Sequence, residues 1–115
     1  MTRLLVLVLG LAMIALPALA ETIQASDARA HVGQTVTVEG TVGDVFTGRS
    51  GVTFIDIGGR YPHNSFTAVI FKTDAGKFPG VASLGGKTVD VTGPVRLYHG
   101  RPEIVLNTGS QLKSR

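Results

Sequence analysis

The sequence contains no cysteine and no tryptophan among its 115 residues. Without cysteine, the chain has neither a disulfide framework nor an N-terminal cysteine that could carry a lipid anchor. The acidic residues are few and lie about one to each predicted element. A metal-dependent phosphodiesterase needs clustered carboxylates, and a covalent mechanism needs a nucleophile beside a base. We therefore predict that the protein is not an enzyme and has no catalytic residues.

The sequence also lacks a recognisable metal or phosphate-loop motif. Its three histidines, His31, His63 and His99, fall in three different predicted connections, and no two of them have a metal-ligand spacing. The pair Gly58-Gly59 is not followed by the lysine and hydroxyl residue of a phosphate-binding loop. We predict no metal site and no cofactor, and we interpret each histidine as a loop residue.

The first 20 residues have the pattern of a secretory signal peptide. A positive charge at Arg3 precedes an apolar run, and the small residues at positions 17–20 end in Ala20. The run is shorter than the roughly 20 residues that a spanning helix needs, although a retained membrane anchor is the alternative. Cleavage after Ala20 leaves residues 21–115 as one domain with a net charge of +2. We therefore predict a periplasmic or secreted protein with no stable membrane anchor after cleavage.

One ten-residue pattern occurs twice. Residues Gly33–Val42 return as Gly86–Val95, an offset of 53 residues. In both copies valines alternate with polar residues, which is typical of a half-buried strand, and we place these valines in the core. Both copies also carry a glycine within the strand, at Gly40 and Gly93. A glycine at this point allows the bend or bulge that a strand needs in a small barrel.

The order of the predicted elements indicates an all-β fold with one helical connection. The predicted strands are residues 34–46, 52–57, 66–72, 87–98 and 101–106, and a short helix is predicted within residues 73–84. Five strands with a helix between the third and fourth form the order of an OB-fold, a partly open five-stranded Greek-key barrel. Its binding face is built on strands 2 and 3 and on the loops joining strands 1 and 2 and strands 4 and 5. A small β-sandwich is the competing fold, but it accounts less well for the lone helix and the repeat.

Alternation assigns a face to each side chain of the second predicted strand. Because the charge of Asp56 must remain solvated or paired, we place Ile55 and Ile57 in the core. This phase leaves Phe54 on the outer face, where a large aromatic side chain requires an explanation.

The third predicted strand is apolar on both faces, so its phase depends on Lys72. If Lys72 points outward, Val69 and Phe71 lie in the core. Ala68 and Ile70 then share the outer face with the lysine.

Several short motifs carry a family resemblance. They are Gly40-x-Val42, Thr53–Ile57, Ala68–Lys72, Gly86–Gly93 and Tyr98-x-Gly100. Together they resemble the anticodon-binding-type OB superfamily, which includes the anticodon-binding domains of aminoacyl-tRNA synthetases and the N-terminal domain of the exonuclease VII large subunit. In that group the aromatic residue of the second-strand motif often stacks on a base, and the resemblance implies this role for Phe54. The chain departs from the synthetase pattern after Ile57, where a basic and acidic pair is replaced by two glycines.

An outward aromatic surrounded by cations is the way in which OB domains hold single-stranded nucleic acid. Stacking contributes about 1–3 kcal/mol per base, and the cations follow the phosphates. The candidate ligand-binding residues are Phe54, Arg49, Tyr61, Lys72, Arg96, Tyr98 and Arg101. The alternatives are a Phe54 covered by the loop that holds Tyr61 and Pro62, and arginines that only protect an edge strand.

Two hypotheses for the function remain open at this stage, besides an accessory domain with no ligand. In the first, the protein is an exported OB-fold protein that binds single-stranded DNA or RNA, or an oligonucleotide-like anionic ligand. In the second, it is a periplasmic interaction or stress-tolerance protein whose same face binds a protein, a cation or a small molecule. The outward aromatic favours the first hypothesis, whereas the predicted export favours the second, because free nucleic acid is scarce outside the cytoplasm.

Overall fold

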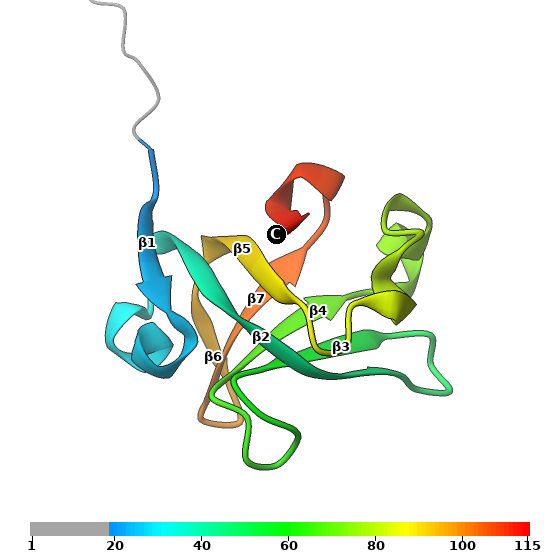
Figure 1. Cartoon of the computed structure of the whole chain (residues 1–115), viewed down its shortest axis with the longest axis horizontal. Helices are drawn as coiled ribbons and strands as arrows, with labels where there is room; N and C mark the ends of the chain where they lie inside the picture. The colour runs from blue at the N-terminus through cyan, green and yellow to red at the C-terminus, as the bar shows by residue number, and fades with distance from the viewer. Residues whose placement is uncertain (1–18) are drawn as a thin grey trace, which may run out of the picture.

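Eight strands and four 3-10 helices form the part of the chain that the computed structural model describes, residues 19–115 (Figure 1). In chain order they are β1 (Glu21–Gln24), η1 (Ala25–His31), β2 (Thr35–Thr47), β3 (Thr53–Ile57), β4 (Phe66–Ile70), η2 (Lys72–Lys77), η3 (Val81–Ser83), β5 (Thr88–Pro94), β6 (Arg96–Tyr98), β7 (Arg101–Leu106), η4 (Gly109–Gln111) and β8 (Leu112–Ser114). Residues 1–18 of the predicted signal peptide lie outside the described residues. No helix within residues 19–115 is long and apolar enough to cross a membrane.

The strands form one sheet in the order β6-β7-β4-β3-β2-β5-β8, and β1 pairs with β2 beside this path. The predicted all-β class is supported, but the predicted five-stranded barrel is wrong, because the sheet is open and has eight strands. The fourth predicted strand is split into β5 and β6 at Val95, which follows a proline that cannot donate a ladder hydrogen bond. The added strands β1 and β8 have only four and three residues, too few to show a clear alternation in the sequence.

The two copies of the valine repeat pair with each other. Strands β2 and β5 run antiparallel, and Val38 lies opposite Val91, its counterpart in the repeat. The flanking pairs are Val36–Gly93 and Gly40–Val89. The repeat in sequence thus becomes an approximate two-fold relation in the sheet, centred on the Val38–Val91 pair.

The two repeated glycines lie where a neighbouring side chain approaches the strand closely. A Cβ atom added at Gly40 would lie 2.5 Å from Cγ2 of Ile57, and one added at Gly93 would lie 2.7 Å from Cγ2 of Ile104. Both isoleucines are fully buried. The glycines are therefore required by packing, since any larger side chain would displace a core isoleucine.

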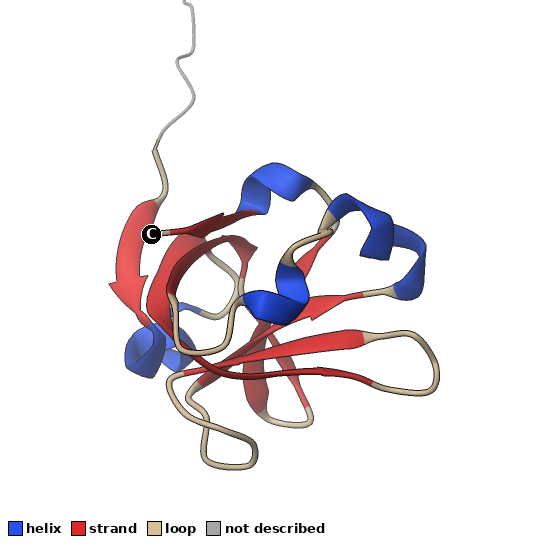
Figure 2. Cartoon of the chain, turned by 45° about the vertical axis from the view of Figure 1, so that its right-hand side comes forward, coloured by secondary structure: helices blue, strands red, loops and turns tan. Residues whose placement is uncertain are grey.

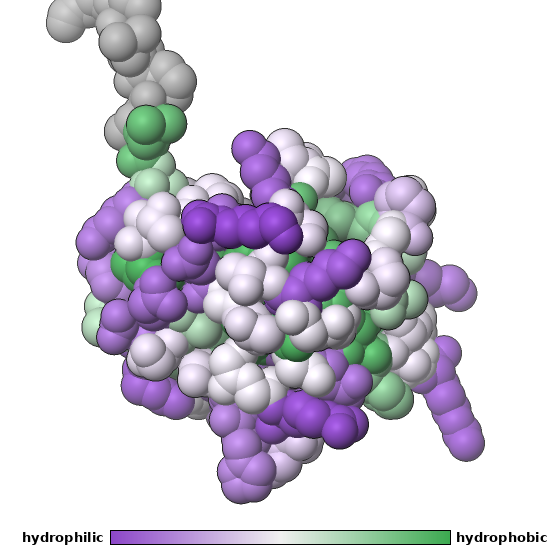
Figure 3. Space-filling view, in the orientation of Figure 1, coloured by the Kyte–Doolittle hydropathy of each residue, from purple (hydrophilic) through white to green (hydrophobic). Residues whose placement is uncertain are grey.

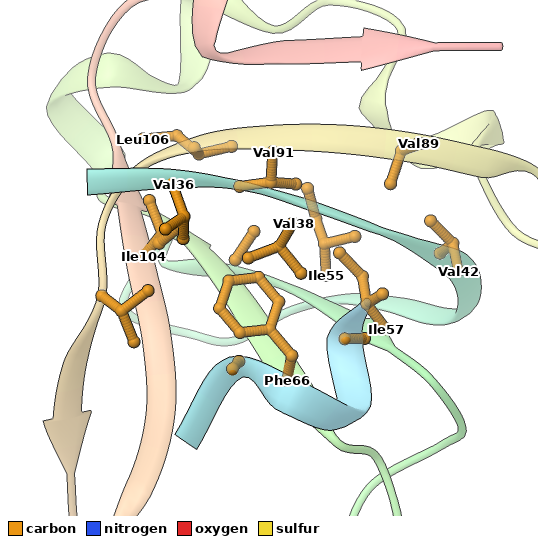
Figure 4. Packing of buried hydrophobic residues seen from close by; sticks show 14 of the residues in the cluster. Val36, Val38, Val42, Ile55, Ile57, Phe66, Val89, Val91, Ile104 and Leu106 are labelled. Atoms are coloured by element: carbon orange, nitrogen blue, oxygen red, sulfur yellow. The ribbon is translucent and has the colours of Figure 1, made fainter. Parts of the chain in front are cut away.

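The core lies between the curled parts of the sheet. Figure 4 shows the buried valines, isoleucines and Leu106 of β2, β3, β5 and β7 converging on one interior, with Phe66 of β4 above η1. The largest fully buried side chains are Phe66, Ile55, Ile57, Ile70, Ile104, Leu106, Val36, Val38, Val42, Val89, Val91 and Val95. The predicted core positions on β2, β3 and β5 are confirmed. The face of the molecule seen in Figure 3 is mostly hydrophilic or neutral, with hydrophobic residues only in small separate areas.

The predicted phase of the third strand is wrong. Ala68 and Ile70 lie in the core, whereas Phe71 is 41% exposed and Val69 is buried on the opposite face of the sheet. The strand ends at Ile70, and Lys72 already belongs to η2. The outward direction of Lys72 therefore gives no information about the faces of β4.

The predicted single helix between the third and fourth strands is replaced by two 3-10 helices, η2 and η3. Pro79 and Gly80 lie between them, and proline cannot continue a helical hydrogen-bond pattern. The spaced apolar residues Phe78 and Leu84 are nevertheless buried against the core, with Val81 packed beside them. Figure 2 shows these helical turns at the periphery of the strands, where they cover one end of the core.

Candidate functional site

A groove of about 580 Å³ lies on the outer face of the sheet, on the side opposite the core. We call it the aromatic groove. It is lined by Asp44, Phe46, Phe54, Asp56, Tyr61, Thr67, Tyr98, His99, Arg101, Pro102 and Glu103. Figure 1 shows the β3–β4 loop and the β6–β7 turn, which supply part of this lining, at the same end of the molecule. A groove of this size is within the range of about 300–1,000 Å³ that is usual for small-ligand sites.

Two phenylalanines face each other across the strands at one end of the groove. Phe46 of β2 lies opposite Phe54 of β3 in the antiparallel ladder. The register shifts between Val42 and Asp44, so that the outward positions of β2 change from odd to even residues after the irregularity at Gly43. Phe46 is 58% exposed, and it was not among the candidate residues predicted from the sequence. In the sequence, the change in the alternation of apolar residues after Gly43 is the signal that could have identified the outward direction of Phe46.

Tyr98 and His99 approach the groove from the β6–β7 turn. His99 has a φ of 51° and Gly100 a φ of 76°, so both central residues of this two-residue turn are left-handed. That geometry matches the twist of the paired strands. The His99 ring stands edge-on to the Tyr98 ring, at a centroid distance of 4.2 Å. Tyr98 remains 56% exposed, and its ring is available to a ligand.

Arg101 is held in place at the end of the groove by neutral groups. Its Nη2 donates to Asn64 Oδ1 at 2.7 Å and to the carbonyl oxygen of Pro62 at 3.2 Å. The guanidinium carbon lies 5.2 Å from the centre of the Tyr61 ring, a cation–π distance. Asn64 in turn donates to the carbonyl oxygen of Phe66 at 2.9 Å. The side chain that accepts from Arg101 is therefore itself buried and held by a hydrogen bond. Its orientation is therefore fixed before any ligand binds.

Carboxylates also line the groove, in one row across the sheet. Asp44 lies opposite Asp56, which is followed across β4 by Thr67 and then by Glu103 of β7. Glu103 is paired with Arg96 at 2.7 Å. The groove is consequently of mixed charge, with its negative charges concentrated at its centre.

Asp56 is the least exposed of the groove carboxylates, at 5%, and Glu103 follows at 6%. Burial raises the pKa of its carboxyl group, and the backbone N–H of Tyr61, at 3.4 Å, acts in the opposite direction by donating to Oδ2. The neighbouring charge of Asp44 raises the pKa further, and Arg101 lowers it. Asp56 therefore accepts hydrogen bonds in a partly desolvated position on the floor of the groove.

The structure brings together four of the seven candidate residues from the sequence: Phe54, Tyr61, Tyr98 and Arg101. Arg49 lies in the β2–β3 turn. The side chain of Lys72, from η2, lies beside this turn, at 2.9 Å from a Cβ atom added at Gly51. Arg96 is held by Glu103 outside the lining of the groove. Phe54 is partly exposed and the Tyr61 side chain is 70% exposed, so the β3–β4 loop does not seal the phenylalanine into the core.

Within residues 19–115, no group of three or more histidine or acidic side chains is arranged to hold a metal ion. Exposed rings, one fixed guanidinium and buried acceptors can bind a planar, hydrogen-bonding ligand.

No protein-family model matches the chain, and no curated protein matches it. Solved structures do match. The OBody AM1L10 bound to hen egg-white lysozyme has a TM-score of 0.61 at 18% identity, covering 89% of this chain and 98% of the other. A putative aspartyl-tRNA synthetase from Leishmania major Friedlin has a TM-score of 0.57 at 14% identity, and the match covers 92% of this chain. The aspartyl-tRNA synthetase from Entamoeba histolytica has a TM-score of 0.51 at 18% identity, over 74% of this chain.

These similarities concern the fold. The chain spans only 23% of the Leishmania synthetase and 19% of the Entamoeba synthetase, so it resembles one domain of each. The expected likeness to an OB-type domain of aminoacyl-tRNA synthetases is supported at this level, with the open eight-stranded sheet described above.

Proposed function

We propose that the protein is an exported OB-fold binding protein that holds single-stranded nucleic acid, or an oligonucleotide-like anionic ligand, in the aromatic groove. The observation that carries the proposal is the set of ring side chains on one outer face: Phe46, Phe54, Tyr61 and Tyr98. Phe46, Tyr61 and Tyr98 are each more than half exposed, which leaves their faces or edges open to a ligand. Unstacked bases are planar, and stacking on such rings contributes about 1–3 kcal/mol per base.

The charges of the groove indicate how such a ligand would lie. The carboxylates of Asp56 and Glu103 are inside the groove and repel phosphates, but they can accept hydrogen bonds from the N–H groups of bases. The cations are at the margins: Arg101 beside the β3–β4 loop, and Arg49 and Lys72 at the β2–β3 turn. We infer that bases enter the groove while the phosphate backbone follows its edges.

The fold similarity supports this assignment. Two of the structurally similar proteins are named aspartyl-tRNA synthetases, which act on an RNA. The chain corresponds to about a quarter or less of each, so their enzymatic activity is not part of the proposal.

Titration of the protein into fluorescently labelled oligo-dT at low salt tests the proposal. We expect a saturable rise in anisotropy that weakens as salt increases, because phosphate contacts release counterions. Phe54→Ala should weaken binding by about 1–3 kcal/mol, the contribution of one stacked base. Phe71→Ala is the matched control, since Phe71 is also partly exposed but does not line the groove. Absence of binding at low salt, or equal losses in both variants, contradicts the proposal.

A protein ligand is the second candidate for the same face. One structurally similar protein, the OBody AM1L10, is bound to hen egg-white lysozyme, so this fold also supports protein binding. The carboxylates in the groove are compatible with a basic protein partner. In that case the wild-type protein would capture a partner from a periplasmic extract and the Phe54→Ala variant would not. Excess oligo-dT would not displace the captured partner.

The proposed export has its own test. The pattern of residues 1–20 predicts cleavage after Ala20, so the mature protein should begin at Glu21. N-terminal sequencing of protein isolated from the envelope fraction of a bacterial host should find this end. An intact N-terminus in the cytoplasmic fraction would contradict export.

A further inference from the structure

A second, smaller cavity of about 220 Å³ adjoins the aromatic groove. We call it the polar pocket. It lies between η1, the β3–β4 loop and the beginning of β7, and it is lined by Ser26, Arg29, Asn64, Ser65, Phe66, Thr67, Arg101 and Pro102. Two arginines line it and no acidic residue does. Its charge is therefore opposite to that of the centre of the groove, where three carboxylates lie.

Arg101 belongs to both cavities. All three of its hydrogen bonds to the described residues use Nη2, and every acceptor is a neutral oxygen of Pro62 or Asn64. Arginine has five N–H donors, so those on Nε and Nη1 remain for a ligand. The contacts with Asn64 and the Tyr61 ring hold the guanidinium plane in place. A fixed guanidinium loses little freedom when it binds an anion.

Arg29 supplies the second positive charge, from η1. It forms no ion pair with the described residues, in contrast to Arg60, Arg96 and Arg115. Ser26 on the same helix and Ser65 on the β3–β4 loop add hydroxyl groups to the lining. The pocket thus combines two guanidinium groups with neutral donors and contains no carboxylate to neutralise them.

We propose that the polar pocket binds one phosphate-type oxyanion, and that in the complete ligand this group is a terminal phosphate of the strand whose bases lie in the aromatic groove. The assignment of this group to a terminal phosphate rests on the proposed function, whereas the binding of an oxyanion does not. The pocket is smaller than the roughly 300–1,000 Å³ of sites for drug-sized ligands, and its volume suits a single tetrahedral anion. Guanidinium groups bind such anions through paired, charge-assisted hydrogen bonds.

The first test uses inorganic phosphate alone. We expect saturable changes in the NMR signals of the Asn64 side-chain amide and the Arg29 Nε–H, followed in ¹⁵N–¹H spectra at constant ionic strength. Arg29→Gln should weaken this binding about tenfold, the loss of one charge-assisted contact. Lys113→Gln is the matched control, since it removes one positive charge from an exposed position on β8 outside both cavities. Shifts that do not saturate, or that persist unchanged in Arg29→Gln, overturn the proposal.

The second test compares oligo-dT carrying a 5′-phosphate, a 3′-phosphate or only hydroxyl ends. One of the phosphorylated strands should bind about tenfold more tightly than the hydroxyl strand, and Arg29→Gln should remove this difference. Equal affinities for all three strands, each dependent on Phe54, overturn the terminal-phosphate assignment and leave the proposed function intact. Saturable binding of inorganic phosphate without binding of any strand supports the oxyanion pocket and contradicts the proposed nucleic-acid function.

Discussion

Two regions on the outer surface of the same sheet differ in which side chains are paired within the protein and which are exposed. On β2 and β5, the carboxylates of Glu39 and Asp90 lie side by side, and Arg115 bridges them at 2.7 Å and 3.0 Å. We call these three residues the Arg115 cluster. The aromatic groove instead exposes Phe46 of β2, Tyr61 of the β3–β4 loop and Tyr98 of β6.

This difference in pairing and exposure distinguishes a structural surface, which stabilises the fold, from a binding surface, which is open to a ligand. In the Arg115 cluster each charge is paired within the protein, and the hydroxyls of Thr37 and Thr92 pair in the adjacent row at 2.8 Å. In the groove, large rings remain in contact with water although a folded chain gains by burying them. Exposed aromatic surface gathered into one hollow is typical of a ligand site.

The largest expected effect concerns the strand pair that supports both regions. Gly40→Ala should lower the free energy of unfolding by about 1–3 kcal/mol, because the new methyl group would lie 2.5 Å from Ile57 Cγ2 in a filled core. Gly93→Ala should cost a similar amount against Ile104. Urea denaturation measures both. Gly85→Ala is the control, since no atom lies within 4 Å of the added Cβ. Equal stability of all three variants would show that the glycines are not required by packing.

A second substitution affects the groove without affecting the core. Phe46→Ala should weaken oligo-dT binding by about 1 kcal/mol through lost stacking, with little change in melting temperature because the ring is 58% exposed. Leu97→Ala, at a 47% exposed position outside the groove, should leave binding unchanged. A fall in melting temperature with unchanged binding would assign Phe46 to the structural surface instead.

The buried carboxyl group of Asp56 in the groove predicts that the stability of the fold depends on pH. Because the pKa of Asp56 is raised in the folded protein, the folded state binds more protons than the unfolded state between the ordinary carboxyl pKa and the raised one. This contribution to stability is therefore largest at acidic pH and is lost as pH rises through the raised pKa. Asp56→Asn, whose amide oxygen can still accept from the Tyr61 N–H, should be more stable than the wild type at neutral pH. The difference should shrink below the ordinary carboxyl pKa, and an unchanged difference across a pH series of thermal melts would contradict this account.

The smallest effect is expected in the Arg115 cluster. Hydrogen bonding to Asp90 and the charges of Asp90 and Glu39 raise the pKa of Arg115, so the guanidinium stays charged throughout the working range. Arg115→Gln should lower the melting temperature slightly at low salt by leaving two adjacent carboxylates unbridged. The difference should disappear at high salt, because exposed charges are screened. A salt-independent loss would indicate that Arg115 acts through packing.

Much of the fold is predictable because the alternation of residue types is long and regular in β2, β3 and β5. The valines of the repeat were assigned to the core from period two, and Ile55 and Ile57 from period two together with the charge of Asp56. All of them are buried. The phase of β4 was not predictable in this way, because all five of its residues except Thr67 are apolar. Its direction is set by tertiary packing, since Phe66 and Ile70 belong to the same buried cluster as Val38 of β2, and Figure 4 shows Phe66 beside η1.

The candidate site was predictable where a single strand sets the direction of a side chain. Phe54 was placed outward by its own alternation with Ile55. Phe46 was missed because its direction depends on the register shift at Gly43, and His99 was missed because it reaches the groove through a left-handed turn. The polar pocket could not be predicted, since Arg29 and Arg101 are 72 positions apart in the sequence and meet only after folding.

The most direct test of the central claim is to detect contacts between the Phe54 ring and the bases of a bound strand. In the complex with oligo-dT, we expect intermolecular NOEs from the Phe54 ring protons to thymine protons, with amide shift changes concentrated on β3, β7 and the β6–β7 turn. If the strand binds with shift changes centred on Glu39 and Asp90, and no NOE reaches Phe54, the aromatic groove is not the nucleic-acid site.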